Sequence, residues 1–186
     1  MLKKGELSTA FKVYFEDAER CLGANAYWCL LHVTVCLPDV CAALQSRDGK
    51  ASGVRYEKWC NKYFSQPCLV GSERYEIRCK VLHQGRARTA KQPRYSGFAF
   101  GHRDSAGRVD HLRVDGRTLH VDVGELYSET RQAIRQWILA LESRLKSAQA
   151  TNTARNLSLL VRVSKQQVPV SARGGTLSYS IISKTT

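Results

Sequence analysis

Residues 26–44 read AYWCLLHVTVCLPDVCAAL, an almost continuous apolar run in a chain of 186 residues. The run is long enough to cross a membrane, but it contains Asp39, and an aspartate near the middle of a span is costly in lipid. The whole chain has the composition of a soluble globular protein, with 43% hydrophobic and 24% charged residues. We therefore expect residues 26–46 to form a buried core helix, kinked near Pro38, and we expect no membrane partner.

Helical periodicity appears on both sides of this run, because apolar residues recur there at spacings of three and four. The further helices that this spacing predicts span residues 8–22, 54–64, 72–84 and 124–148. Ser8 or Thr9 is placed to cap the first of them, and Ser72 the third. Gly85 is placed to end the helix that Ser72 begins. The pattern predicts a mainly α fold, a bundle of four or five helices.

Strand-like segments interrupt and follow the helices. Residues 109–114 and 118–123 flank Asp115-Gly116, which is a strong hairpin signal, and residues 96–103 alternate in polarity. Residues 157–163 and 176–182 predict a second, C-terminal strand pair, after a polar linker at 148–156.

These elements fit one domain better than two, because a chain of this length supports one sizeable core. We expect a helical domain at residues 1–148 that carries a β-hairpin insertion at about 95–123. Residues 149–186 are predicted to form a basic β extension packed on the same domain.

The seven cysteines all lie in the first 79 residues. Their number is odd and no two have C-x-x-C spacing, which argues against a zinc site and against a disulfide framework. Cys29, Cys36 and Cys41 fall in the apolar run, where free cysteine behaves as a small hydrophobe. No apolar region follows Lys3 and Lys4 to make a signal peptide. We expect reduced core cysteines in a cytoplasmic protein.

The net charge of +13 is concentrated in two segments. Residues 77–103 and residues 143–186 each contain seven basic residues and no acidic residue, and the rest of the chain is close to neutral. Such segments attract polyanions and speed their encounter. Nucleic acid is the partner that this pattern favours, over an anionic membrane or a charge that serves only solubility.

Arg78 and His83 stand in the predicted helix at 72–84, at the start of the first basic segment. An arginine binds phosphate oxygens through its rigid fork, and a histidine exchanges protons near neutral pH. Together they can promote attack of an RNA 2′-hydroxyl on its own phosphate, a reaction that needs no metal and leaves DNA intact. The competing interpretation of His83 is a solvated histidine at a helix end.

The spacing of this pair is weak support by itself. A chain with 18 arginines and five histidines is expected to contain about one Arg-x(4–6)-His match by chance. Arg113 and His120 form a second match, but they straddle the Asp115-Gly116 turn and are interpreted as strand side chains.

The flanking residues strengthen the interpretation. Residues 75–85, YEIRCKVLHQG, resemble the signature helix of the HEPN superfamily, whose ribonucleases carry Arg-x(4–6)-His with apolar residues in the gap. Arg78 and His83 match that arginine and histidine, whereas Cys79 replaces the polar residue that commonly follows the arginine. The resemblance extends over the helical layout of residues 8–148, and the predicted strands are not part of it.

This resemblance implies a HEPN-like helical bundle that forms a homodimer, with two Arg-His pairs in one cleft. It implies a metal-independent endoribonuclease without a cofactor, which leaves 2′,3′-cyclic phosphate ends. HEPN nucleases often act as toxins or in defence against phage, which implies an antitoxin or a defence-system protein as a partner.

Several neighbouring residues are predicted to support the pair. Asp39 needs a partner in its apolar helix: either an arginine or histidine of the site, or backbone amides freed by Pro38. Gln84 is a candidate to bind a phosphate or a base. The residues predicted to guide the RNA backbone are Lys80, Arg86, Arg88, Lys91 and Arg94.

Two other groups have a structural and a functional interpretation. His32 is interpreted as a core histidine rather than a ligand. Tyr95, Phe98 and Phe100 could stack on bases, but a half-buried strand explains them better.

Two alternatives to an enzyme remain open. The chain could be a non-catalytic RNA-binding or dimerisation module, which would bind RNA in a salt-dependent way and release no cyclic phosphate. It could also be an assembly subunit whose helix at 26–46 packs on a partner, and the isolated chain would then be unstable.

Overall fold

The apolar run forms α2 (Tyr27–Gln45), the central helix of the fold. The computed structural model describes residues 1–65, 69–83, 94–103, 107–160, 162–163 and 181–182. Within them, α2 contacts all five other helices, and Pro38 lies buried inside it. It is the one described helix whose length and hydropathy would also suit a membrane span. Its packing confirms the prediction of a buried core helix.

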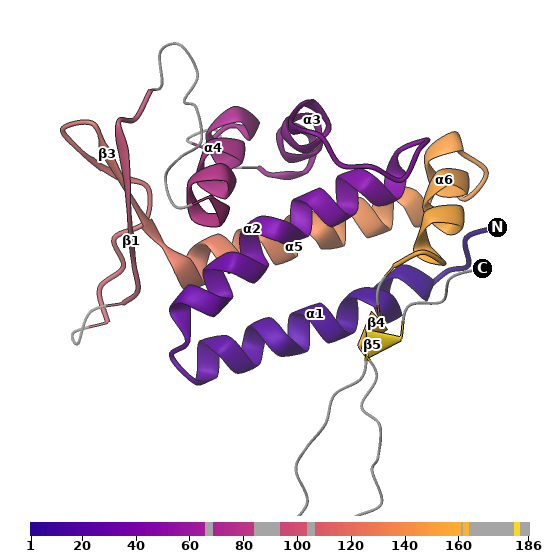
Figure 1. Cartoon of the computed structure of the whole chain (residues 1–186), viewed down its shortest axis with the longest axis horizontal. Helices are drawn as coiled ribbons and strands as arrows, with labels where there is room; N and C mark the ends of the chain where they lie inside the picture. The colour runs from indigo at the N-terminus through magenta and orange to yellow at the C-terminus, as the bar shows by residue number, and fades with distance from the viewer. Residues whose placement is uncertain (66–68, 84–93, 104–106, 161, 164–180, 183–186) are drawn as a thin grey trace, which may run out of the picture.

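Five further helices surround α2 in the described part of the chain. They are α1 (Glu6–Gly23), α3 (Gly53–Tyr63), α4 (Gly71–Leu82), α5 (Val123–Glu142) and α6 (Ala148–Leu157). The long helices α1, α2 and α5 pack on one another, while α3 and α4 lie on the side of α2 away from α1 (Figure 1). The mainly α prediction is confirmed.

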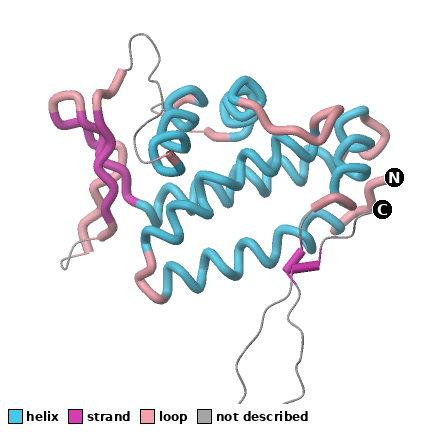
Figure 2. Tube along the Cα trace, viewed as in Figure 1, coloured by secondary structure: helices cyan, strands magenta, loops and turns pink. Residues whose placement is uncertain are grey.

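A small mixed sheet lies at one end of the helices (Figure 2). It contains β1 (Gly97–Gly101), β2 (Arg113–Asp115) and β3 (Thr118–Asp122), in the order β1-β3-β2. β2 and β3 are antiparallel around Asp115-Gly116, which confirms the predicted hairpin. β1 confirms the predicted strand at 96–103, but it pairs with β3 in parallel, an arrangement that its alternating pattern does not indicate.

The sheet continues directly into α5. Asp122 ends β3 and caps α5, because its Oδ1 accepts a hydrogen bond from the backbone N–H of Glu125 over 2.9 Å. A carboxylate at this position also suits the positive end of the helix dipole. One side chain therefore both ends β3 and caps α5.

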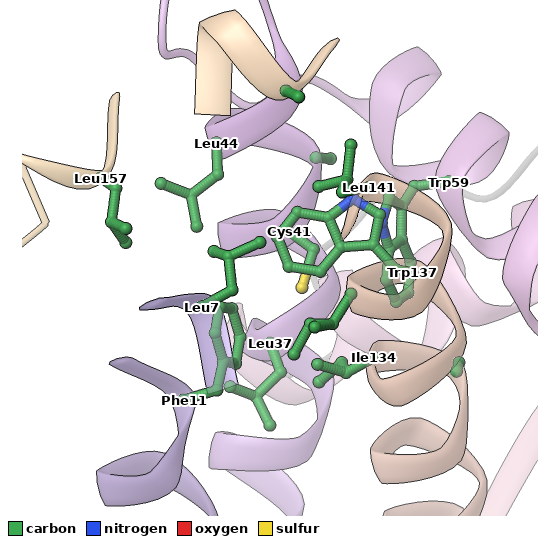
Figure 3. Close-up of a cluster of buried hydrophobic side chains, with 14 of the residues drawn as sticks. Leu7, Phe11, Leu37, Cys41, Leu44, Trp59, Ile134, Trp137, Leu141 and Leu157 are labelled. Atoms are coloured by element: carbon green, nitrogen blue, oxygen red, sulfur yellow. The ribbon is translucent and has the colours of Figure 1, made fainter. Parts of the chain in front are cut away.

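The larger of two apolar clusters holds the helices together (Figure 3). Phe11 of α1 and Trp59 of α3 meet Trp137 of α5 edge-on, with ring centroids 5.6 and 6.3 Å apart. Leu37 and Cys41 of α2 belong to the same cluster. Burial of such side chains stabilises a fold by about 1.5–3 kcal/mol each.

The second cluster joins α4 to the sheet. Ile77 and Val81 of α4 belong to it, together with Leu119 and Val121 of β3. Tyr95, Phe98 and Phe100 belong to or pack against the same cluster, which confirms the half-buried strand and leaves Tyr95 only 4% exposed. This contact places the inner face of the sheet against α4, which carries Arg78.

Residues 148–157 form α6 instead of the predicted linker. Ser147 caps the helix by accepting a hydrogen bond from the backbone N–H of Ala150, and Ala150 and Leu157 are buried. Asn156 then donates from Nδ2 to the carbonyls of Leu44 and Ser46 at the end of α2, over 2.9 and 2.8 Å. The segment is polar partly because Asn156 binds the free carbonyl groups at the C-terminal end of α2. The bundle thus has six described helices, and the helix predicted at 124–148 ends at Glu142, six residues early.

Two residues of each predicted C-terminal strand pair with each other in the described part of the chain. β4 (Arg162–Val163) pairs with β5 (Ile181–Ile182) in the antiparallel sense. The remaining residues predicted in this pair, 164–180, lie outside the described residues, and residues 157–160 are not part of the strand.

Three local predictions are wrong. Neither Ser8 nor Thr9 caps α1, because the helix begins at Glu6 with Gly5 at its N-cap. Ser72 does not cap α4, because the helix begins at Gly71 and the Glu73 carboxylate accepts from the backbone N–H of Val70 over 2.9 Å. Cys29 is exposed and Cys36 half-buried, whereas Cys41 is fully buried as expected. The periodicity of α2 explains this difference, since Cys29 and Cys36 lie seven residues apart on one face.

Candidate functional site

Arg78 of α4 is held against α2 by Asp39. Its Nε donates a hydrogen bond to Asp39 Oδ2 over 2.7 Å, and the two side chains are 22% and 17% exposed. Of the two partners considered for Asp39, the structure places an arginine of the predicted site beside it. Burial alone would lower the pKa of Arg78, but the hydrogen bond and charge of Asp39 outweigh it and raise that pKa.

Two side chains of α4, Cys79 and Tyr75, lie near the guanidinium of Arg78. Cys79 lies beside the guanidinium, with Nη1 4.0 Å from Sγ, and the Tyr75 ring centroid lies 5.8 Å from Cζ of Arg78. Burial raises the pKa of Cys36 and of Tyr75, and the charge of Asp39 raises both further. Burial and the charge of Asp39 therefore favour the neutral forms of Cys36 and Tyr75.

His83 occupies the C-cap of α4. Its backbone N–H donates to Cys79 O over 2.9 Å, and its side chain is exposed. Five residues separate it from Arg78, which corresponds to about 140° of rotation around a helix. Among the described residues, no side chain hydrogen-bonds to the imidazole, and no contact joins it to Arg78. The helix ends two residues earlier than the predicted end at Gln84.

The predicted RNA-binding residues divide into three groups. Lys80 is 18% exposed, paired with Glu76 over 3.1 Å and placed above the Phe98 ring, so it serves the contact between α4 and the sheet. Arg94 lies 3.7 Å from Glu73, but its side chain is still 60% exposed to solvent. Gln84, Arg86, Arg88 and Lys91 lie outside the described residues.

His32 of α2 packs locally. Its Nδ1 lies 2.8 Å from the carbonyl oxygen of Trp28, and the two rings meet edge-on at 4.7 Å. Trp28 itself is 62% exposed. Arg113 and His120 pair across β2 and β3, which confirms that their spacing reflects the hairpin.

The sequence prediction missed two histidines that meet buried carboxylates. His111 accepts from the backbone N–H of Asp122 at Nδ1 over 3.2 Å, so its proton is on Nε2, which faces Glu129 at 3.1 Å. Glu129 also binds Arg74 over 2.7 Å. His102 Nδ1 lies 3.6 Å from Asp122 Oδ2. The available signal was Asp122 before α5, where a cap is expected.

No group of three or more His, Cys, Asp or Glu side chains gathers at metal-binding distance in the described part of the chain. No protein-family model matches the chain, and neither a curated protein nor a solved structure shows significant similarity to it. The fold and the site define a mainly helical protein with a small mixed sheet, a half-buried arginine–aspartate pair between α4 and α2, and an exposed histidine at the C-cap of α4. Its function must be inferred from these residues.

Proposed function

We propose that this protein is a metal-independent endoribonuclease of the HEPN type, in which Arg78 binds the phosphate and His83 transfers protons. The observation that carries the proposal is the ion pair between Arg78 and Asp39. An arginine that served only solubility would extend into water, whereas this one is fixed by a carboxylate in the central helix. A fixed guanidinium binds a phosphate with less loss of side-chain entropy.

The proposed reaction is a transesterification within RNA. The 2′-oxygen attacks the adjacent phosphorus, and His83 accepts the proton of the 2′-hydroxyl. The bond from phosphorus to the 5′-oxygen breaks, and that oxygen takes a proton from solvent or from a second imidazolium. Arg78 stabilises the negative charge on the non-bridging oxygens through Nη1 and Nη2, since Nε is engaged by Asp39.

The separation of Arg78 and His83 around α4 supports a site shared by two copies of the chain. A single helix turns these side chains about 140° apart, so a phosphate held by one Arg78 is more easily reached by the His83 of another copy. Arg94, which is exposed beside the start of the sheet, would then border such a cleft.

A second candidate is a non-catalytic RNA-binding or dimerisation module. It is favoured by the absence of a contact between Arg78 and His83 among the described residues, and by the exposed Trp28 on α2. Such a module would bind RNA in proportion to its basic residues and leave the strand intact.

The first test compares three proteins on a labelled RNA in the presence of a chelator: the wild type, His83→Ala and His32→Ala. The wild type and His32→Ala should cleave at similar rates, and His83→Ala should be at least about 100-fold slower. His32→Ala is the matched control because His32 also borders solvent, on α2. Equal rates for all three proteins would refute the role of His83, and RNA binding without any cleavage would favour the module.

A further inference from the structure

A small internal cavity lies beside Pro38 of α2, where helices α2, α3, α4 and α5 meet. Its volume is about 10 Å³, which is close to the space that one water molecule needs. Its polar lining comes from Thr34, Tyr56, Arg74 and Thr130, and all four of these side chains are buried. The cavity is therefore an interior space with several groups that can form hydrogen bonds.

The hydroxyl of Thr34 has no partner in the described part of the chain. The residue is 1% exposed, and its Oγ1 is buried without a hydrogen bond. Every other threonine of the described helices donates from Oγ1 to the carbonyl four residues earlier, over 2.8–3.1 Å: Thr9, Thr130, Thr151 and Thr153. A buried hydroxyl without a hydrogen bond is costly, so Thr34 needs a partner from elsewhere.

The backbone carbonyl of Thr34 lacks its usual partner as well. In a regular helix the N–H of residue 38 would donate to the carbonyl of residue 34. Residue 38 is a proline, which has no N–H to donate. Buried carbonyls in this situation are commonly satisfied by side chains or by ordered water. Two groups of one residue thus need partners beside the same cavity.

The other walls offer acceptors. Thr130 of α5 uses its hydroxyl proton on the carbonyl of Leu126 over 2.8 Å, and its oxygen can still accept a hydrogen bond. Tyr56 of α3 donates to the carbonyl of Val35 over 3.4 Å, and its oxygen can also accept. A molecule that both donates and accepts therefore suits this space.

We infer that the cavity binds one ordered water molecule, which accepts a hydrogen bond from Thr34 Oγ1 and donates to the Thr34 carbonyl and to Thr130 Oγ1. Three hydrogen bonds are typical of a buried water. The one charged group in the lining, Arg74, is already paired with Glu129 over 2.7 Å, so a neutral ligand fits better than an ion. The water bridges α2 to α5 at the residue before Asp39.

The water site does not depend on the proposed nuclease. It contains neither Arg78 nor His83, and its detection needs no RNA. A protein that fails to cleave RNA would leave the water site standing, and a dry cavity would leave the nuclease proposal standing.

The test counts long-lived water molecules in the full chain by oxygen-17 relaxation dispersion of the solvent. The wild type and Thr34→Ser should hold one more such water than Thr34→Val, because the valine replaces the hydroxyl by a methyl group. Thr153→Val is the matched control, since Thr153 is also buried in a helix but donates to the carbonyl of Gln149. It should keep the wild-type count. Equal counts in the wild type and Thr34→Val would overturn the inference. A count of zero in the wild type would overturn it without any variant.

Thermal unfolding of the same proteins gives a second readout, which differs in sign. With a bound water the hydroxyl of Thr34 is satisfied, so Thr34→Val should lower the melting temperature by about 2–4 °C, the effect of one typical hydrogen bond in a chain of this size. In a dry cavity the hydroxyl would be unsatisfied, and the valine would then raise the melting temperature. A Thr34→Val protein that melts above both the wild type and Thr153→Val would contradict the inference.

Discussion

Arg78 Nε and Asp39 Oδ2 are 2.7 Å apart, and this bond ties the middle of α4 to the middle of α2. The contact explains why an aspartate follows Pro38 in an otherwise apolar helix: a half-buried carboxylate is stabilised by an arginine that it holds in turn. It also gives the proposed phosphate-binding group a fixed position.

Asp39→Asn should separate stability from orientation at this bond. The amide keeps the size of the side chain but loses the charge, so we expect a loss of about 1–3 kcal/mol in the free energy of unfolding. Cleavage of RNA should fall by at least about 10-fold at temperatures where the variant is fully folded, because Arg78 is no longer fixed. Urea denaturation and initial cleavage rates measure the two effects.

Asp17→Asn is the control for that variant, since Asp17 pairs with Arg20 at an exposed position on α1. It should leave both the unfolding midpoint and the cleavage rate close to those of the wild type. An Asp39→Asn protein that behaved like this control would show that the ion pair is incidental.

Arg78→Lys tests the fork of the guanidinium. The lysine keeps the positive charge beside Asp39 and should largely preserve the fold, but it cannot bind a phosphate through two parallel hydrogen bonds while it pairs with the aspartate. We expect cleavage to fall by roughly 10- to 100-fold with little change in the melting temperature. Wild-type rates in this variant would remove Arg78 from the proposed mechanism.

Glu129→Gln should destabilise the protein at neutral pH. Glu129 binds Arg74, whose side chain is 3% exposed, and faces Nε2 of His111. Loss of the carboxylate leaves a buried guanidinium without its counter-ion, which costs about 3 kcal/mol. Chemical denaturation at pH 7 measures this cost.

The same variant should alter the acid side of the stability profile. Burial alone would raise the pKa of Glu129, but the hydrogen bond to His111 and the charge of Arg74 outweigh it and lower that pKa. The carboxylate therefore stabilises the fold fully above its unfolded pKa of 4.5, and the contribution is lost as the pH falls through the lower folded value. The wild type should lose stability more steeply than Glu129→Gln below pH 4.5, and parallel profiles would contradict this linkage.

Asn156→Ala should loosen the contact between α6 and the end of α2. The amide of Asn156 serves the carbonyls of Leu44 and Ser46, which would remain buried without a donor, at a cost of about 1–3 kcal/mol. Asn152→Ala is the matched comparison, because Asn152 has longer hydrogen bonds of 3.4 Å, one from Nδ2 to Gln45 O and one accepted from Arg155. Equal losses in the two variants, measured by thermal unfolding, would show that Asn156 has no special role.

Elements with strong local signals could be predicted from the sequence. The apolar run of α2 predicts a central helix, and Asp115-Gly116 predicts the hairpin between β2 and β3. α6 could not be predicted from hydrophobic periodicity, because two of the residues that it packs against α2, Asn152 and Asn156, are polar. The parallel pairing of β1 with β3 is likewise set by tertiary packing rather than by local pattern.

The candidate site could also be predicted only in part. Arg78 could be named from its spacing to His83 and Asp39 from the need of a buried carboxylate for a partner, but the sequence left two partners open for the aspartate. His102 and Asp122 escaped notice, since each looks ordinary by itself and only the fold brings them within 3.6 Å. Lys80 shows the converse: a basic residue in a basic segment is already engaged by Glu76.

The most direct test of the proposed nuclease is the chemistry of its product ends. A short RNA is incubated with the wild-type protein in chelator, beside the same RNA with 2′-O-methyl groups, and the fragments are weighed by mass spectrometry. We expect 2′,3′-cyclic phosphate on the upstream fragment of the unmodified RNA and no cleavage of the methylated one, because the 2′-hydroxyl is the nucleophile. Cleavage of the methylated strand, 3′-hydroxyl ends, or an intact unmodified RNA would contradict the proposal.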